Sequence, residues 1–231
     1  MGARIGELLQ ASVERGAVPG AVAVLVGPDG PPEEAAAGVL RVGGDARVTE
    51  TTMFRYASMT KAMTSVAALQ LAERGRLDLD RDVASILPEH GELQVLEGFD
   101  GDLPRLRPPV RRATVRQLLN HTAGHGYWFA NADLLRYHEV TGTPTPMDGL
   151  KAGLRMPLVA DPGTRWEYGI NTDWLGQVVE AISKTDLASY LAEHVFAPLD
   201  MADATFAPTP EQRDRLMVVH ERTGDGGLRP T

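Results

Sequence analysis

The chain of 231 residues contains no cysteine. A disulfide framework, a thiol nucleophile and a cysteine-based metal site are therefore excluded. No segment approaches 18 consecutive apolar residues, and the N-terminus lacks the apolar stretch of a signal peptide. We therefore expect no membrane partner and predict a cytoplasmic protein.

Lysine is also scarce, with 3 lysines among the 23 basic residues, which leaves 20 arginines. The formal net charge is −8 and the sequence pI is about 5.3. An acidic chain is a poor ligand for nucleic acid, so we expect no nucleic-acid partner. The scarcity of lysine also makes each lysine informative, because lysine can release its proton at accessible pH whereas arginine cannot.

The hydrophobic content of 43% is sufficient for a substantial core. A β-prone run at 21–26, a returning run at 35–42 and an apolar helix at 58–74 predict an antiparallel sheet flanked by helices. The later part of the chain is mostly helical in pattern. The fold class predicted is α/β, of the α+β type.

We divide the chain into three regions on this basis. Residues 1–80 form the N-terminal part of a sheet domain, residues 81–205 form a mostly helical region, and residues 206–231 begin the return to the sheet. Residues 88–113 are rich in proline, glycine and arginine and are expected to be irregular.

Ser58 and Lys61 stand one helical turn apart at the start of the predicted helix 58–74. A hydroxyl there lies near unpaired backbone N–H groups, and a neighbouring amine can accept its proton if burial lowers the amine pKa. The alternative is structural: a serine that caps the helix, followed by a lysine that extends its amine to solvent. The local pattern leaves both interpretations open.

Three stretches taken together resemble one family. Ser58-Met59-Thr60-Lys61 is similar to the Ser-x-x-Lys motif of serine β-lactamases and penicillin-binding proteins. Leu118 to Gly124 resembles the Leu-Leu-x-His-Thr-Ser-Gly segment, and Tyr168, which follows Pro162-Gly163-x-x-Trp166, resembles the tyrosine of the second motif. The residues in these motifs are most similar to those of family VIII carboxylesterases and related acyltransferases.

The resemblance implies a β-lactamase/transpeptidase-like fold and a catalytic set of Ser58, Lys61 and Tyr168. Ser58 is the expected nucleophile, and Lys61 and Tyr168 share the general-base role, either as neutral lysine or as tyrosinate. Tyr56 and Tyr127 are rival tyrosines, of which Tyr56 is expected to belong to the core or the pocket wall.

The substrate-binding residues expected are Tyr127, Trp128, Phe129 and Asn171. The three consecutive aromatic residues form either core or the wall of an acyl pocket. His121 and His125 are four residues apart, but Gly124 and Gly126 interrupt a helix there. We therefore expect no metal and no cofactor, and we expect His121 to fix a turn by hydrogen bonding.

The chain departs from the family pattern twice. Ile170 occupies the place of the asparagine in the Tyr-x-Asn motif of class C β-lactamases, and Asn171 comes one residue later, which favours esters over lactams. The family's third motif, on a late strand that supplies an oxyanion donor, has no counterpart in 169–231. We therefore expect the C-terminal sheet strands to be missing, and a complementary C-terminal chain or a homo-oligomer as partner.

The function expected is a serine hydrolase that forms an acyl-enzyme, a carboxylesterase acting on a small-molecule substrate, a short-chain or aryl ester. Two alternatives stay open: a β-lactamase or D,D-peptidase, and a non-catalytic fragment or binding module that keeps the fold without a complete site.

Overall fold

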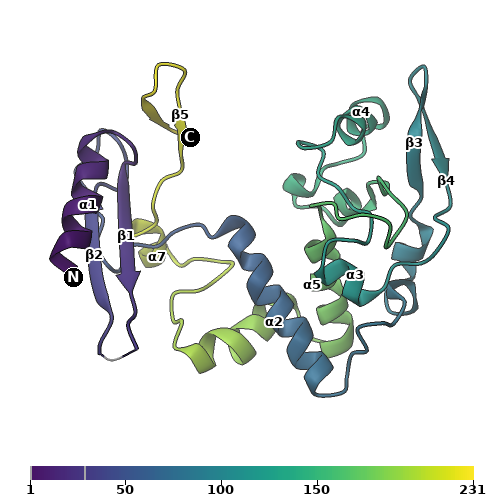
Figure 1. The fold of residues 1–231 in the computed structure, drawn as a ribbon, viewed down its shortest axis with the longest axis horizontal. Coiled ribbons are helices and arrows are strands. Elements are labelled where there is room, and N and C mark those ends of the chain that lie inside the picture. Colours follow the sequence, from purple (N-terminus) through teal and green to yellow (C-terminus); the bar gives the residue numbers. More distant parts are fainter. Residues whose placement is uncertain (1, 29) are drawn as a thin grey trace. The chain divides into compact units, whose positions relative to one another are not determined.

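The computed structural model describes residues 2–28 and 30–231. The chain forms two compact units. One unit is formed by the residues up to Ala57 together with those from Thr205 onward, and the other by Ser58–Ala204. The expectation of an α+β chain with antiparallel sheets and flanking helices is confirmed (Figure 1).

The first unit is built on a β-hairpin with helix α1 packed against it. Strands β1 (Gly20–Leu25) and β2 (Glu33–Gly38) pair antiparallel from Gly20↔Gly38 to Leu25↔Glu33. Helix α1 packs on them, and a second antiparallel pair follows late in the chain. The further elements of this unit are α1 (Gly2–Glu14), α7 (Pro210–Asp214), β5 (His220–Arg222) and β6 (Leu228–Pro230).

Strand β1 differs from its prediction in burial. A continuous apolar run predicts a strand covered on both faces, yet Val24 is 55% exposed and Val26, just beyond the strand, is 71% exposed. In the described residues the sheet has two strands, and the apolar side chains at the end of β1 are left exposed.

The second unit is built around two packed helices. Helix α2 (Thr60–Glu73) lies along α5 (Asn171–Ser183), and both contact α6 (Leu187–Leu191). Their apolar side chains join those of the preceding and following segments in one continuous core. The remaining helices of this unit are α3 (Val115–Leu119), α4 (Ala132–Thr141) and the π-helix η6 (Ala192–Phe196), with short 3-10 helices at 83–85, 88–92, 146–148, 151–155 and 197–199.

The segment 58–74 is apolar almost all round, a pattern that predicts a buried helix. The structure buries Ala67, Ala68 and Leu71 completely, while Val66 and Leu69 are 43% and 47% exposed. The helix is therefore covered on one side, the side that faces α5 and α6, and that prediction was wrong for the other side.

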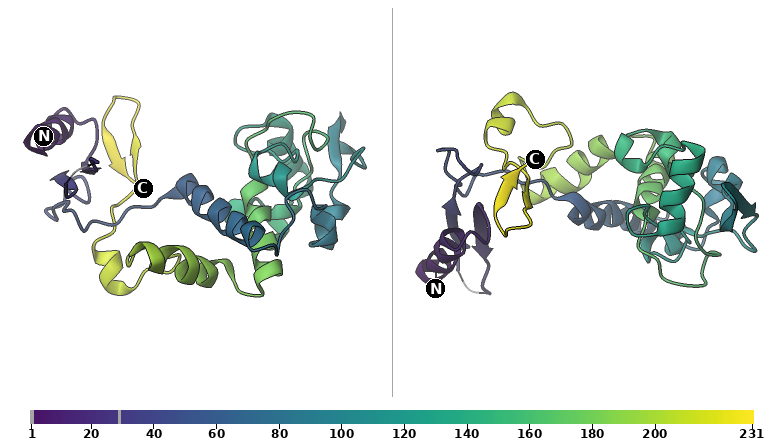
Figure 2. Two further views of the ribbon diagram at one scale, coloured as in Figure 1. Left: turned by 60° about the horizontal axis from the view of Figure 1, so that its bottom comes forward. Right: turned by 90° about the horizontal axis from the view of Figure 1, so that it is seen from above.

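An antiparallel ribbon lies within the segment that was expected to be irregular. Strand β3 (Val95–Asp100) pairs with β4 (Leu103–Arg107), with a bulge between Leu96 and Gly98. Two further views show this ribbon at the side of the helical unit (Figure 2). None of the described helices is long and apolar enough to cross a membrane.

Candidate active site

Ser58 lies in a short 3-10 turn, η1 (Ala57–Met59), immediately before α2. The residue at the N-cap of α2 is Met59, which makes no side-chain cap, so Ser58 is not the capping serine of the structural alternative. The Lys61 ammonium instead donates a hydrogen bond to Ser58 Oγ at 3.2 Å. Ser58 is exposed, and its hydroxyl is therefore open to a substrate.

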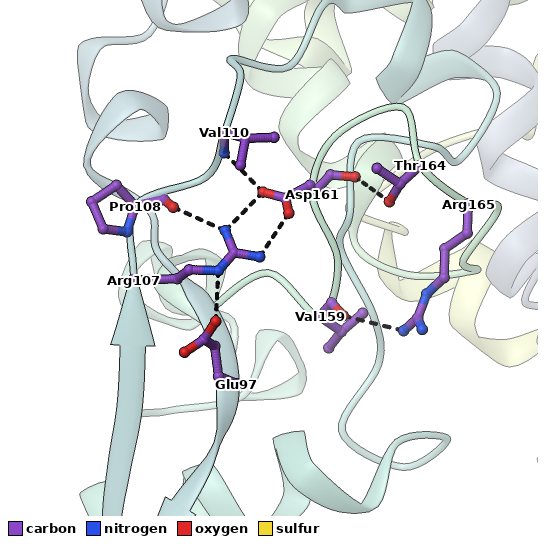
Figure 3. A network of polar contacts seen from close by, with 8 residues as sticks. All are labelled: Glu97, Arg107, Pro108, Val110, Val159, Asp161, Thr164 and Arg165. Atoms are coloured by element: carbon purple, nitrogen blue, oxygen red, sulfur yellow. Dashed lines mark hydrogen bonds and ion pairs between the residues drawn. The ribbon is translucent and has the colours of Figure 1, made fainter.

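Tyr168 is held by the segment that leads to it, and the anchor of this segment is Asp161. Arg107 from β4 donates to both carboxylate oxygens of Asp161 at 2.9 and 2.7 Å, and Val110 N–H donates to one of them (Figure 3). The Arg107 guanidinium and the Val110 N–H lower the pKa of Asp161 to about 2. The anchor thus stays ionised throughout the physiological range.

The backbone on either side of Tyr168 is fixed by the loop after α3. Glu167 N–H donates to the carbonyl of His121 at 2.8 Å. A Cβ at Gly169 would lie 2.3 Å from the carbonyl oxygen of His125, so the chain can approach this closely only because residue 169 is glycine. Helix α5 then begins at Asn171.

Four side chains from three separate segments converge here. The Lys61 ammonium nitrogen lies 5.1 Å from the ring centre of Tyr168 and 5.5 Å from that of Tyr127. The two tyrosine rings are 5.4 Å apart. The Ser58 hydroxyl is also the main cause of the lowered pKa of Tyr168, so the expected nucleophile interacts with both expected partners.

The two tyrosines that flank Lys61 have opposite pKa shifts. The hydrogen bond from Ser58, followed by the interaction with Lys61, lowers the pKa of Tyr168. Burial raises the pKa of Tyr127. Of these two phenols, Tyr168 is therefore the one more easily ionised, and Tyr127 keeps its proton while its oxygen accepts from the Lys61 ammonium.

The pKa of Lys61 bears on the two forms of the general base that the sequence left open. Burial lowers this pKa, but hydrogen bonds to Tyr127 and Tyr168 outweigh burial, and the pKa is raised overall. A charged Lys61 favours the ionised form of Tyr168, so this direction favours tyrosinate over neutral lysine. The base role of either residue stays a prediction.

The expected substrate-binding aromatics continue from Tyr127. Their rings are in mutual contact: those of Tyr127 and Phe129 stack at 4.8 Å, and Trp128 meets both at 6.0 and 5.1 Å. Phe129 is 65% exposed, which excludes a core position for this ring. Trp166 is also 65% exposed and stacks on Tyr168 at 6.3 Å. Contacts between these rings and a substrate stay a prediction.

Asn171 lies elsewhere in the network. Its side chain is completely buried, and its amide nitrogen faces the Nδ1 of His121 at 3.0 Å and the carbonyl of Glu167 at 3.3 Å. A polar residue at the helix start, Asn171 or Thr172, would be the cap that the sequence predicts for α5, but Ile170 takes the N-cap position. A direct contact between Asn171 and a substrate stays a prediction.

The histidines occupy structural positions. His121 fixes the turn after α3 by hydrogen bonding, as expected. His125 is buried and its Nε2 lies 3.1 Å from that of His90, a contact the sequence did not indicate because 35 residues separate the two. Among the residues that the structure describes, no three His, Asp or Glu side chains are grouped so as to hold a metal ion.

Tyr56, the other rival tyrosine, was expected to be core or pocket wall on a strand. The structure gives it no strand, and its side chain is 43% exposed. This exposure makes the core interpretation of Tyr56 wrong, and the pocket-wall interpretation stays a prediction.

Comparisons with known proteins agree with this geometry. A family model described as Beta-lactamase matches residues 5–231. Monacolin J acid methylbutanoyltransferase of Aspergillus terreus is 40% identical over 186 residues, and lovastatin esterase of Penicillium rubens is 35% identical over 174 residues. These alignments cover 77% and 74% of this chain, and 44% of each relative.

A solved structure shares the whole described architecture. Unliganded simvastatin synthase (LovD) from Aspergillus terreus superimposes with a TM-score of 0.88 at 33% sequence identity. The superposition covers 100% of this chain and 62% of that protein. The chain thus spans less than half the length of the curated relatives named above, and 62% of this structural one.

Proposed function

Because the chain belongs to the beta-lactamase family, we propose that Ser58 forms an acyl-enzyme and that the protein is a carboxylesterase for short-chain or aryl esters. The observation that carries the proposal is the hydrogen bond from Lys61 Nζ to Ser58 Oγ at 3.2 Å, together with the Lys61 ammonium lying 5.1 Å from the ring centre of Tyr168, whose pKa the Ser58 hydroxyl lowers. The named relatives include both an esterase and acyltransferases, which supports acyl transfer in general.

The proposed reaction starts with the ionised form of Tyr168. Its phenolate takes the proton of Ser58 as Ser58 Oγ attacks the ester carbonyl, and the Lys61 cation stabilises the phenolate before the transfer. Tyr168 then returns the proton to the departing alkoxide as the ester C–O bond breaks. The acyl group remains on Ser58 until water or another alcohol attacks it with the same proton transfers.

The test compares Ser58→Ala with Ser65→Ala. Ser65 lies two turns along α2 and its hydroxyl donates to the carbonyl of Lys61 at 2.8 Å, so it is a matched serine without access to the proton path. We expect covalent labelling by a fluorophosphonate and hydrolysis of p-nitrophenyl butyrate to be lost in Ser58→Ala and kept in Ser65→Ala. Labelling that maps to Ser65, or that survives Ser58→Ala, would overturn the assignment of Ser58 as the nucleophile.

Two substrates separate the alternatives. Turnover of p-nitrophenyl butyrate without turnover of nitrocefin supports the esterase, and the reverse result supports a β-lactamase. Binding of an ester without label or turnover in the wild type would support the non-catalytic module.

A second candidate function is acyl transfer to an alcohol. The observation favouring it is the exposed aromatic surface of Phe129 and Trp166 beside the reacting groups, which suits an apolar acceptor better than water alone. The test is the ratio of ester exchange to hydrolysis when butanol is added to the p-nitrophenyl butyrate assay. A ratio that does not rise with butanol concentration would leave hydrolysis as the function.

A further inference from the structure

His121 adopts a left-handed backbone conformation, which is uncommon for residues with a side chain. It follows α3 and its cap Asn120 with φ of 59°. Glycine or asparagine is the usual choice after a helix, and histidine is found in this region more often than most other residues. A residue persists in this conformation where the surrounding structure holds it in place.

Both the backbone and the side chain of His121 contact the residues that flank Tyr168. The carbonyl of His121 accepts from Glu167 N–H at 2.8 Å, on one side of Tyr168. Its Nδ1 meets the amide nitrogen of Asn171 at 3.0 Å, on the other side. The imidazole ring lies 5.0 Å from the ring of Tyr168. His121 thus contacts Tyr168 and a residue on either side of it, Glu167 and Asn171.

The hydrogen bonds define the tautomer of His121. The amide nitrogen of Asn171 also faces the carbonyls of Glu167 at 3.3 Å and His125 at 3.5 Å, so this atom is the donor NH₂ and not the amide oxygen. The Nδ1 of His121 must therefore accept, and the ring proton is on Nε2. Burial and then the Lys61 cation lower the pKa of His121, which keeps Nδ1 free to accept.

We propose that His121 is a positioning residue for Tyr168: its neutral imidazole ties Asn171 and the ring of Tyr168 together so that the phenol points at Ser58. The proposal rests on the proposed function only in naming Tyr168 as the base. If the only role of residue 121 were to end α3, asparagine would serve equally well, because asparagine adopts the left-handed conformation readily.

Two substitutions distinguish the contribution of the His121 ring from that of its hydrogen-bond acceptor, Nδ1. His121→Asn suits the left-handed backbone and removes the ring, whereas His121→Phe keeps a ring and removes the acceptor. His138→Asn is the control, since His138 is a half-buried histidine near the end of α4 whose Nδ1 lies 2.6 Å from the carbonyl of Thr143.

The readout is the ionisation of Tyr168, followed by ultraviolet absorbance of the phenolate and isolated by subtracting the same variant in a Tyr168→Phe background. We expect both His121 variants to raise the ionisation midpoint of Tyr168 by at least about half a pH unit, as contacts with Ser58 and Lys61 are lost. We expect the acylation rate by p-nitrophenyl butyrate to fall about 10- to 100-fold. His138→Asn should change neither quantity.

The ionisation measurement does not need turnover. A shifted midpoint in a protein without acylation activity would support the positioning role and overturn the proposed function instead. A midpoint and an acylation rate of His121→Asn that equal those of the wild type would overturn the positioning role. Should His121→Phe fail to fold, His121→Asn decides the question alone.

Discussion

At the scale of single residues, the site depends on a difference between two similar phenols. Tyr127 and Tyr168 lie at nearly the same distance from the Lys61 ammonium, 5.5 and 5.1 Å. What separates them is the hydrogen bond of Tyr168 to Ser58, which is the main cause of its lowered pKa. Tyr127 has no such hydrogen bond to Ser58, and burial is the main cause of its raised pKa.

The corresponding substitutions should therefore differ in effect. Tyr168→Phe removes the proposed base, and we expect the rate of acylation to fall by roughly 10²–10⁴-fold. Tyr127→Phe removes a hydrogen bond to Lys61 but no proton acceptor, so its loss should be smaller by at least about tenfold. Single-turnover acylation by p-nitrophenyl butyrate measures both. If Tyr127→Phe were the more damaging change, the base would have been assigned to the wrong tyrosine.

The pH dependence of acylation follows from the same shifts. The base must be ionised, so the rate should rise with pH through the Tyr168 pKa, which lies below the usual tyrosine range. Lys61 must stay charged, so the rate should fall again only above the usual lysine range, because its pKa is raised. Stopped-flow acylation between pH 6 and pH 11 (roughly the span of these groups) records the profile.

Lys61→Arg provides the control for that profile. Arginine stays protonated over this range, so the alkaline decline should disappear while the rising limb remains. An alkaline decline that persists in Lys61→Arg would show that another group, or unfolding, causes it.

The sequence predicted which residues form the site better than it predicted their protonation. Ser58 and Lys61 are three residues apart, so their contact is a local property of a helix start. The raised pKa of Lys61 depends on Tyr127 and Tyr168, which come from segments 66 and 107 residues later, as the residue numbers give (127 − 61 and 168 − 61). A local pattern contains no information about such partners.

At the scale of elements, the close approach of two loops sets the position of Tyr168. A Cβ at Gly169 would lie 2.3 Å from His125 O and 2.6 Å from the Cα of Gly126. Backbone atoms cannot yield to a methyl group as a flexible side chain can. Position 169 therefore tolerates glycine alone without a shift of the loop.

Gly169→Ala should destabilise the fold by about 1–3 kcal/mol and reduce acylation, since the methyl group pushes the loops apart. Gly6→Ala is the control, because a Cβ there meets nothing within 4 Å on α1 and alanine favours helix by about 0.5–1 kcal/mol. Urea unfolding of both variants measures the difference. Equal free energies of unfolding for Gly169→Ala and wild type would show that the loops separate without cost.

The contact of His90 with His125 links the 3-10 turn at 88–92 to the loop after α3. Burial lowers the pKa of His90 to about 4 and that of His125 well below the usual range. In the unfolded chain both titrate near pH 6.5. Stability is therefore fully present above about pH 6.5 and is lost as pH falls from there, because the unfolded state binds the protons.

We expect the free energy of unfolding to fall by up to about 3 kcal/mol per histidine between pH 6.5 and pH 4. Urea unfolding at several pH values measures it, and His90→Gln should remove part of the slope. His138→Gln is the control, since His138 has no comparable burial. A slope unchanged by His90→Gln would show that other groups cause the acid sensitivity.

Helix starts can be predicted where a capping residue stands before a helical pattern, and Thr114 before 115–120 is such a residue. Thr114 and Gln117 form the capping box that begins α3. The β3–β4 ribbon was not predicted because a segment with Pro104 and several arginines has the composition of a loop. In addition, Arg107 of this ribbon pairs with Asp161, which comes from a distant segment of the chain. Sequence pattern reports local preference, whereas this ribbon is supported by tertiary contacts.

At the scale of the whole molecule, the free surface of the β1–β2 sheet is the feature with the widest consequence. Val24 and Leu25 are 55% and 39% exposed at the end of β1, and Val26 follows at 71%. An exposed apolar strand in a sheet of two strands favours pairing with another chain. We predict that the chain of residues 1–231 self-associates through this surface.

Val24→Lys should shift the chain toward the monomer, because a charge on an edge strand opposes pairing. Light scattering coupled to size-exclusion chromatography measures the mass. Val110→Lys is the control, since Val110 is 71% exposed but lies outside any strand. A wild type that is monomeric at high concentration would contradict the prediction.

The three tryptophans lie at positions from which their intrinsic fluorescence can report on different parts of the protein. Trp166 stacks on Tyr168 at 6.3 Å, and Trp128 lies 6.0 Å from the ring of Tyr127. Trp174, by contrast, is buried 4.9 Å from His90. Emission from the first two indoles depends on what occupies the space beside Ser58, while the third senses the charge of a buried histidine. Occupancy of the site and acid opening of the core therefore have separate intrinsic fluorescence signals.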